Sequence, residues 1–261
     1  MKKRPRELWV VKLGSGLLTN TRGGTDQRQI SDLCGQIHAL RRRNIQVVLV
    51  SSGAISAGMS ALGLDKRPKD RPTLQACASI GQPLLMKAYA SALQKHGMVC
   101  AQILITSWDM DSRKVYQNAQ GTLARLLSLG HCVPIFNEND ALSFDEIEML
   151  NRFGDNDRLS GHVAILASAS RLVILSGIDG LNTRPDGSGQ WIRRVKGIDE
   201  QIRSYAGTTS SERSVGGMIS KLETARMMFQ AGMPMWIADG RMKNILVELA
   251  AGKVRGTCFK K

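Results

Sequence analysis

The sequence predicts an α/β fold in which a mainly parallel sheet is covered by helices on both faces. Short apolar runs alternate with longer segments of helical period along most of the 261 residues. One run, Ile45–Val50 (IQVVLV), is continuous and rich in β-branched residues, as expected of a parallel strand buried on both faces. No internal repeat, low-complexity tract or linker interrupts this alternation, so we expect one compact unit with two lobes.

Each predicted element follows from its local pattern. Apolar runs predict strands at Leu8–Leu13, Ile45–Val50, Val99–Ile105, Cys132–Phe136, Leu172–Leu175, Met235–Ala238 and Gly256–Phe259. Segments of helical period predict helices at Asp26–Arg43, after Ala54, and at Leu74–Lys95, Tyr116–Leu129, Asp157–Ala167, Met218–Ala231 and Asn244–Ala251. Residues 177–215 are rich in Gly, Asp, Ser and Arg, and predict a hairpin plus a mobile loop.

Composition excludes several classes of protein. Hydrophobic residues make up 43% of the chain and charged residues 22%, which is ordinary for a globular protein. No run approaches the roughly 20 apolar residues that cross a bilayer. The first apolar run is interrupted by Lys12 and is too short for a signal peptide. Five well-separated cysteines indicate reduced thiols, so we expect a cytoplasmic protein.

The formal net charge of +14 leaves two interpretations open. Nucleic-acid binding is one of them. The other, which we favour, is a solvated basic surface together with a site for anionic phosphates. The basic residues are dispersed along the chain, only 12 aromatic residues are present to stack on bases, and no zinc-finger or RNA-binding signature occurs.

In folds of this class, ligands bind where parallel strands end, so the residues just after each strand are the candidates. Lys12 lies at the end of the first strand and is followed by Gly14, Ser15 and Gly16. This segment suits phosphate binding, because glycines let backbone N–H groups approach oxygens and the ammonium neutralises charge. It is neither a Walker A loop nor a GxGxxG motif, and a plain glycine turn is the alternative.

Two further segments offer N–H groups at the start of a helix. Ser51–Ala54 (SSGA) follows the second strand, with helix capping as the alternative. Ser214–Lys221 (SVGGMISK) leads a glycine pair into a helix with Lys221 in its first turn. The alternative there is a glycine-capped helix that carries a surface lysine.

Two acidic and amide clusters complete the set, Asn137–Asp140 (NEND) and Gly154–Asp157 (GDND). Their carboxylates and amides can hold a substrate ammonium group, and an aspartate can fix the position of catalytic lysines. Mg²⁺ can be held through phosphate oxygens and water, so we assign no direct protein ligand to it. Turns and helix caps are the structural alternative.

Taken in order, the segments VVKLGSGLLT, VSSGAISAG, FNENDAL, GDND and GGMISKL resemble the glutamate 5-kinases of the amino acid kinase family. The resemblance covers about residues 8 to 259, and NENDA with GDND separates this group from uridylate kinases and aspartokinases. It implies a three-layer αβα sandwich forming a single domain over residues 1–261. Residues of about 1–170 would form a substrate lobe, and about 171–261 a nucleotide lobe.

The resemblance also implies phosphorylation of the γ-carboxylate of L-glutamate to γ-glutamyl phosphate, the first step of proline biosynthesis. ATP and Mg²⁺ would be required. We expect no nucleic-acid or membrane partner, and a homo-oligomer.

Roles for individual residues follow from the same resemblance. Lys12 and Lys221 would stabilise the transferring phosphoryl group, and Asp157 would orient both lysines. The residues that would hold glutamate are Ser52, Gly53, Asp140 and Asn156. The residues that would line the ATP are Lys12, Gly14, Ser15, Ser176, Gly177, Val215, Gly216, Gly217, Met218, Ile219, Ser220 and Lys221. Because a carboxylate is already a nucleophile, positioning and charge stabilisation would carry the catalysis.

The chain departs from the family at Ser176-Gly177, in a segment between Asp140 and Asp155 that is somewhat longer than usual, and at its C-terminus. Ser176-Gly177 stands where the family usually has Thr-Asp facing the nucleotide, and Asp179 is a candidate substitute for the missing carboxylate. Many members continue into a C-terminal PUA domain, whereas this chain stops at Lys261, so we expect no RNA role by that route.

Two other hypotheses stay open. One is a sister kinase that acts on another acid or on a nucleotide. The other is a basic nucleic-acid binder built on a kinase fold, against which the retention of Lys12, Asp157 and Lys221 argues.

Overall fold

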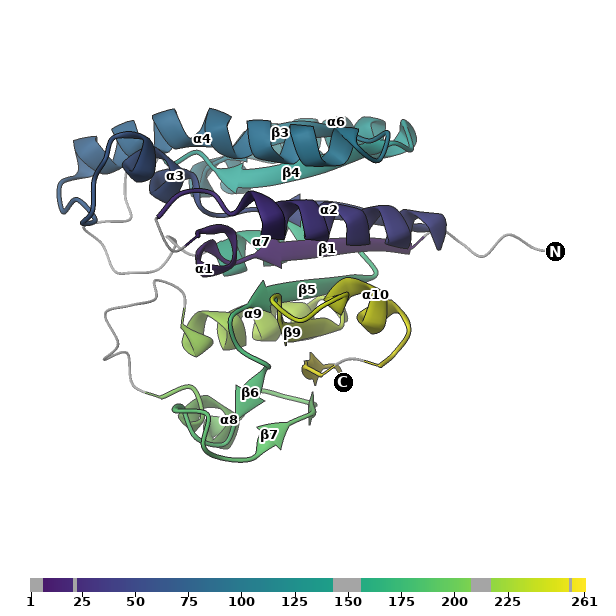
Figure 1. The fold of residues 1–261 in the computed structure, drawn as a ribbon. Helices are drawn as coiled ribbons and strands as arrows, with labels where there is room; N and C mark the ends of the chain where they lie inside the picture. The colour runs from purple at the N-terminus through teal and green to yellow at the C-terminus, as the bar shows by residue number, and fades with distance from the viewer. Residues whose placement is uncertain (1–6, 21–22, 143–155, 208–216, 254) are drawn as a thin grey trace.

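An eight-stranded sheet forms the centre of the structure. The structure is a computed structural model, and it describes residues 7–20, 23–142, 156–207, 217–253 and 255–261. Its strands lie in the order β3-β4-β2-β1-β5-β9-β10-β8 (Figure 1). Their bounds are β1 Glu7–Leu13, β2 Ile45–Val50, β3 Val99–Ile105, β4 Cys132–Glu138, β5 Arg171–Ser176, β8 Arg194–Val195, β9 Met235–Asp239 and β10 Thr257–Phe259. Every described pairing in this sheet is parallel except β9 with β10. A separate antiparallel hairpin joins β6 (Leu181–Asn182) to β7 (Trp191–Ile192).

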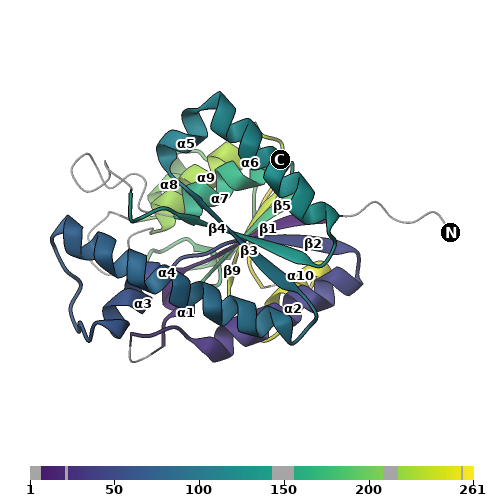
Figure 2. The same cartoon turned by 90° about the horizontal axis from the view of Figure 1, so that it is seen from above.

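Helices cover both faces of the sheet, as the αβα prediction requires. Viewed from above, α2, α3, α4 and α10 lie on one side and α6, α7 and α9 on the other (Figure 2). The helix bounds are α1 Ser15–Leu18, α2 Gln27–Arg42, α3 Ala54–Ala61, α4 Arg71–Gln94, α5 Ser107–Asp111, α6 Arg113–Ser128, α7 Asn156–Leu166, α8 Glu200–Ser204, α9 Met218–Gln230 and α10 Ile245–Ala250.

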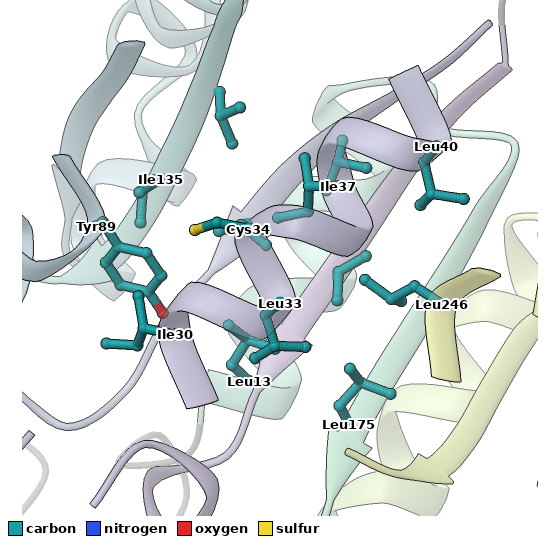
Figure 3. Packing of buried hydrophobic residues seen from close by; sticks show 14 of the residues in the cluster. Leu13, Ile30, Leu33, Cys34, Ile37, Leu40, Tyr89, Ile135, Leu175 and Leu246 are labelled. Carbon is teal, nitrogen blue, oxygen red and sulfur yellow. The ribbon is translucent and has the colours of Figure 1, made fainter. Parts of the chain in front are cut away.

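Two hydrophobic clusters, one on each face of the sheet, form the core. The face of α2 that carries Ile30, Leu33 and Leu40 packs on the sheet, between Tyr89 of α4 and Leu246 of α10 (Figure 3). The other cluster joins the opposite face of the sheet to α7 and α9. Burial of this apolar area on both faces explains why the central strands read as continuous apolar runs.

The pleat of β1 determines which layer its side chains face. Trp9, Val11 and Leu13 belong to the cluster on the α2 side, whereas Val10 belongs to the cluster on the α7 side. Since successive side chains of a strand point to opposite faces, Lys12 shares the side of Val10. The lysine therefore points toward the layer of α7 and α9 at the carboxyl end of the central strand.

Glycines allow α3 and α4 to pack with their backbones in contact. A Cβ on Gly58 would overlap the Cys77 carbonyl, and a Cβ on Gly81 would overlap the Ala54 carbonyl. Side chains larger than hydrogen are excluded at both places, since the obstructing atoms are backbone atoms. This close contact fixes α4, a helix of 24 residues, against the segment that follows β2.

Most predicted elements are found within a few residues of their expected bounds, and the differences have local causes. Helix α4 begins at Arg71 rather than at the predicted Leu74, because the Asp70 side chain caps it. Ser112 starts α6 in the same way, at Arg113 rather than Tyr116. The plain glycine turn that was the alternative after β1 does not form from Ser15 onward, where the short helix α1 begins.

Residues 177–207 contain the predicted hairpin and, in addition, β8 and α8, which were not predicted. The short helix α5, held by a capping box of Thr106 and Asp109, was also not predicted. The division into a substrate lobe and a nucleotide lobe stays a prediction.

Candidate active site

A buried carboxylate between two lysines marks the carboxyl edge of the sheet. Asp157, the second residue of α7, lies 2.6 Å through Oδ1 from Nζ of Lys12 and accepts a hydrogen bond of 2.9 Å through Oδ2 from Nζ of Lys221. The carboxylate is fully buried, and the two lysine side chains are 6% and 7% exposed. The structure therefore brings together the three residues predicted to be catalytic, from β1, α7 and α9.

The electrostatics of this cluster keep Asp157 ionised. Burial alone opposes the charged form and would raise the pKa of Asp157, but the charges of Lys12 and Lys221 outweigh it and lower the pKa. The carboxylate thus fixes two ammonium groups at one place, where together they favour a ligand of opposite charge.

The cluster lies at the point where the chain changes direction across the sheet. Strand β1 pairs with β2 on one side and with β5 on the other. Ligands of parallel α/β sheets bind at such switch points. Gly14 continues β1 by donating its backbone N–H to the Leu175 carbonyl at 3.0 Å, and Ser15 then begins α1.

A second group of polar side chains surrounds Asn156, beside Asp157. Asn156 Nδ2 lies 2.7 Å from the Ser51 carbonyl oxygen, 2.8 Å from Ser52 Oγ and 3.0 Å from Asn137 Oδ1. Gly53 has φ of 101°, a left-handed conformation that favours glycine, and it turns the chain from β2 into α3. The segments SSGA and NEND, each at the end of a strand, therefore meet the end of GDND at the start of α7.

The other predicted residues are placed by the elements that they flank or begin. Asp140 is half-buried, two residues after β4 ends. Gly217 precedes α9, whose first turn contains Met218, Ile219, Ser220 and Lys221. Val215, Gly216, Gly154 and Asp155 lie outside the described residues.

The departure at Ser176-Gly177 is accompanied by an arginine. Ser176 Oγ is buried and has no hydrogen-bond partner among the described residues. A Cβ on Gly177 would lie 3.4 Å from Nη1 of Arg241, whose Nη2 donates to the Gly16 carbonyl at 3.4 Å. An exposed guanidinium thus lies across the ends of β1 and β5, where the family's usual aspartate is missing.

Three residues near the site were not predicted from the sequence. Gln82 and Tyr89 lie on the buried face of α4, where they read as ordinary helix positions, yet they contact Asn137 and Ser51. Arg241 follows β9, and its position directly after a strand was the one signal that could have identified it.

The described part of the chain contains neither a cluster of metal-ligating side chains nor a membrane-spanning helix. There, no group of three or more His, Cys, Asp or Glu side chains could hold a metal ion. No helix in the same residues is long and apolar enough to span a membrane. Two buried lysines, together with a hydroxyl that has no partner in the described part of the chain, fit a nucleotide.

Comparison with known proteins agrees with this geometry. Residues 7–239 match the model of the amino acid kinase family. Glutamate 5-kinase from Azoarcus sp. is 45% identical over 98% of this chain and 68% of its own length. Glutamate 5-kinase from Dehalococcoides mccartyi is 43% identical over 96% of this chain and 67% of its own length. The enzyme from Thermus thermophilus is 42% identical over 96% of this chain and 66% of its own length.

The chain thus spans about two thirds of the length of these relatives. The crystal structure of UMP kinase from Ureaplasma parvum superposes with a TM-score of 0.64 at 15% identity, covering 98% of this chain and all of the other. At that identity the likeness concerns the fold alone.

Proposed function

Because the chain belongs to the amino acid kinase family, within its glutamate 5-kinase branch, we propose that it transfers the γ-phosphoryl group of ATP to the γ-carboxylate of L-glutamate. The product, γ-glutamyl phosphate, is the activated acid with which proline biosynthesis begins. One observation carries the proposal: Asp157 lies between Lys12 and Lys221 at the carboxyl edge of the sheet, next to the amide of Asn156.

The chemistry needs charge and position more than a base. A γ-carboxylate is ionised at neutral pH, so one of its oxygens can attack the γ-phosphorus directly. The new O–P bond forms as the bond to the bridging oxygen breaks, and ADP leaves with that electron pair. The ammonium groups of Lys12 and Lys221 stabilise the negative charge on the phosphoryl oxygens, and Asp157 holds both in place.

The nucleotide would lie over the ends of β1 and β5. Gly14 and Ser15 present backbone there, and the buried Ser176 hydroxyl lacks a partner among the described residues. Arg241 adds a cation at the same edge, beside Ser176-Gly177, where it would attract the phosphates of the nucleotide. Mg²⁺, bound with the nucleotide, would neutralise part of the phosphate charge.

Glutamate would lie on the other side of the lysines. Ser52, Gly53 and Asn156 meet there, and Asp140 follows β4 at the same edge of the sheet. Asn156 Oδ1 has no hydrogen-bond partner among the described residues and suits a donor on the substrate, while the Asp140 carboxylate suits an ammonium group.

We also assign the protein to the cytoplasm and to a homo-oligomer. All five cysteines are free, as expected in a reducing compartment. Strand β3, at the edge of the sheet, leaves Val99 50% and Leu104 36% exposed, which favours contact with a second copy.

A substrate panel tests the function. The chain is incubated with MgATP, hydroxylamine and, in separate reactions, L-glutamate, aspartate, N-acetylglutamate or UMP. Hydroxamate and ADP should form together with glutamate and far faster than with the other acids. Turnover only on another acid or on UMP would assign a sister activity, and no turnover with glutamate would refute the proposal.

A further inference from the structure

We infer that Gln82 is a positioning residue for the amino-acid substrate. Through Asn137 it fixes the side-chain amide of Asn156, so that Asn156 Oδ1 faces the N–H donors of the substrate. The inference rests on the proposed function, because that proposal places the amino group of glutamate beside Asn156. It is carried by a chain of hydrogen bonds that runs from α4 to the first residue of α7.

One backbone carbonyl determines which group donates and which accepts in each of these hydrogen bonds. The Ser51 carbonyl can only accept, so the group of Asn156 that lies 2.7 Å from it must be the NH₂. That NH₂ also faces Asn137 at 3.0 Å, which must therefore present its oxygen. The NH₂ of Asn137 then points to Gln82 at 2.8 Å, and Gln82 must present Oε1.

Burial makes this direction hard to reverse. Asn137 is 1% exposed and Gln82 is 9% exposed, so water cannot readily replace a lost partner. If Asn137 turned over, two NH₂ groups would face each other between Asn137 and Asn156, and two oxygens between Asn137 and Gln82. The acceptor on α4 therefore supports the orientation of an amide two residues away along the chain of hydrogen bonds.

The Ser51 carbonyl, where this chain of hydrogen bonds begins, belongs to a residue that is itself fixed by burial and hydrogen bonds. Ser51 is fully buried, its N–H donates to the Phe136 carbonyl at 2.9 Å, and its hydroxyl lies 2.9 Å from the Tyr89 hydroxyl. Tyr89 and Gln82 both belong to α4. The long helix thus supports the site at two places, through Ser51 and through Asn137.

This chain of hydrogen bonds leaves an acceptor where the substrate's amino group would bind. The two N–H bonds of Asn156 are shared among the acceptors of Ser51, Ser52 and Asn137, and Asn156 keeps Oδ1, which has no partner among the described residues. An acceptor fixed in this way distinguishes glutamate from glutarate, the same diacid without the amino group. Gln82 should therefore affect recognition of glutamate while the phosphoryl-transfer step is left intact.

Replacement of Gln82 by methionine tests the inference in the full chain. Gln82→Met keeps the volume but removes the acceptor of Asn137. The KM for glutamate should rise about tenfold, since a buried donor is left unsatisfied, while kcat and the KM for ATP stay within about twofold. The rate of hydroxamate formation with glutarate should not change, so the preference for glutamate over glutarate should fall about tenfold.

Two comparisons separate positioning from general damage. Gln82→Glu keeps an acceptor toward Asn137 and should stay within about twofold of the wild-type KM, whether or not Gln82→Met folds. Gln36→Met removes an equally buried glutamine, which bonds Asp32 and the backbone of Leu246 far from the site, and should change neither KM.

An unchanged KM in Gln82→Met, a tenfold rise in Gln82→Glu, or an equal loss with glutarate would overturn the inference. A double-mutant cycle adds a further check, because Gln82→Met should have little effect once Asn156 is alanine. If the wild type is active on glutamate and Gln82→Met has the same KM for glutamate, the positioning role alone is refuted. If the wild type has no activity on glutamate, the proposed function is refuted.

Discussion

At the scale of single residues, Asp157 is the group whose charge state the site depends on. Its pKa is lowered in the folded chain because the two lysines outweigh the effect of burial. A carboxyl with a depressed folded pKa stabilises the fold at pH values above its unfolded pKa. That contribution is lost as the pH falls through the folded value, here below the ordinary value of 3.8.

The corresponding prediction compares the wild type with Asp157→Asn. The difference in free energy of unfolding should be constant above about pH 5 and should shrink as the pH falls below the ordinary carboxyl range. Urea unfolding at a series of pH values measures it. A difference that grows toward low pH would contradict the charge assignment.

Arg241 gives a second prediction at this scale. If its guanidinium binds the nucleotide, Arg241→Ala should raise the KM for ATP roughly three- to tenfold, the value of one ordinary hydrogen bond of about 0.5–1.5 kcal/mol. The KM for glutamate should not change. Arg241→Lys is the matched control, since it keeps the charge, and an ATP affinity equal to wild type in Arg241→Ala would remove Arg241 from the nucleotide site.

At the scale of elements, the contact between α3 and α4 positions both Ser52 and Gln82. Gly81→Ala should lower the free energy of unfolding by about 2 kcal/mol or more, because the new Cβ would overlap the Ala54 carbonyl and the backbones must separate. Gly121→Ala is the matched control within α6. A Cβ there meets nothing within 4 Å, so alanine should stabilise the chain by about 0.5–1 kcal/mol.

Chemical denaturation of both variants checks this pair. Gly81→Ala with wild-type stability would mean that the helices tolerate a wider separation. The KM for glutamate should rise in the same variant, because both Ser51–Ala54 and α4 contribute to the site.

The elements also show what the sequence could predict. Strand β2 was predicted with its observed bounds because a strand buried on both faces reads as one apolar run. The short helices α5 and α8 were missed because five residues carry too little periodicity, and their caps are visible only once the fold is known.

For the site, position after a strand identified Lys12 and Ser52, and the resemblance to the family assigned their roles. Gln82 could not be found in this way. Its partner Asn137 lies 55 residues away in the sequence, and a single glutamine on a helix face carries no local signal.

At the scale of the whole molecule, the net charge of +14 acts on stability as well as on ligand binding. Like charges repel in the compact state, and this repulsion is screened by salt. Raising KCl from about 0.01 to 0.1 M shortens the screening length from about 30 to 10 Å and should raise the Tm of the chain. Potassium acetate should act alike, and a Tm that falls with both salts would contradict net repulsion.

The sheet order would place both proposed substrates at one edge of the molecule. The central strand β1 carries Lys12 between β2, which leads to the Asn156 group, and β5, which leads to Ser176 and Arg241. Helices α7 and α9, on one face, bring Asp157 and Lys221 to the same place. The reacting carboxylate and phosphate would therefore meet over β1.

The central claim is that Lys221, held by Asp157, stabilises the phosphoryl group during transfer to glutamate. The most direct test is the rate of glutamyl hydroxamate formation by wild type and Lys221→Met at saturating glutamate and MgATP. Loss of one preorganised cation should lower kcat about a hundredfold or more with a far smaller change in the KM for glutamate. A Lys221→Met enzyme with near wild-type kcat would contradict the account.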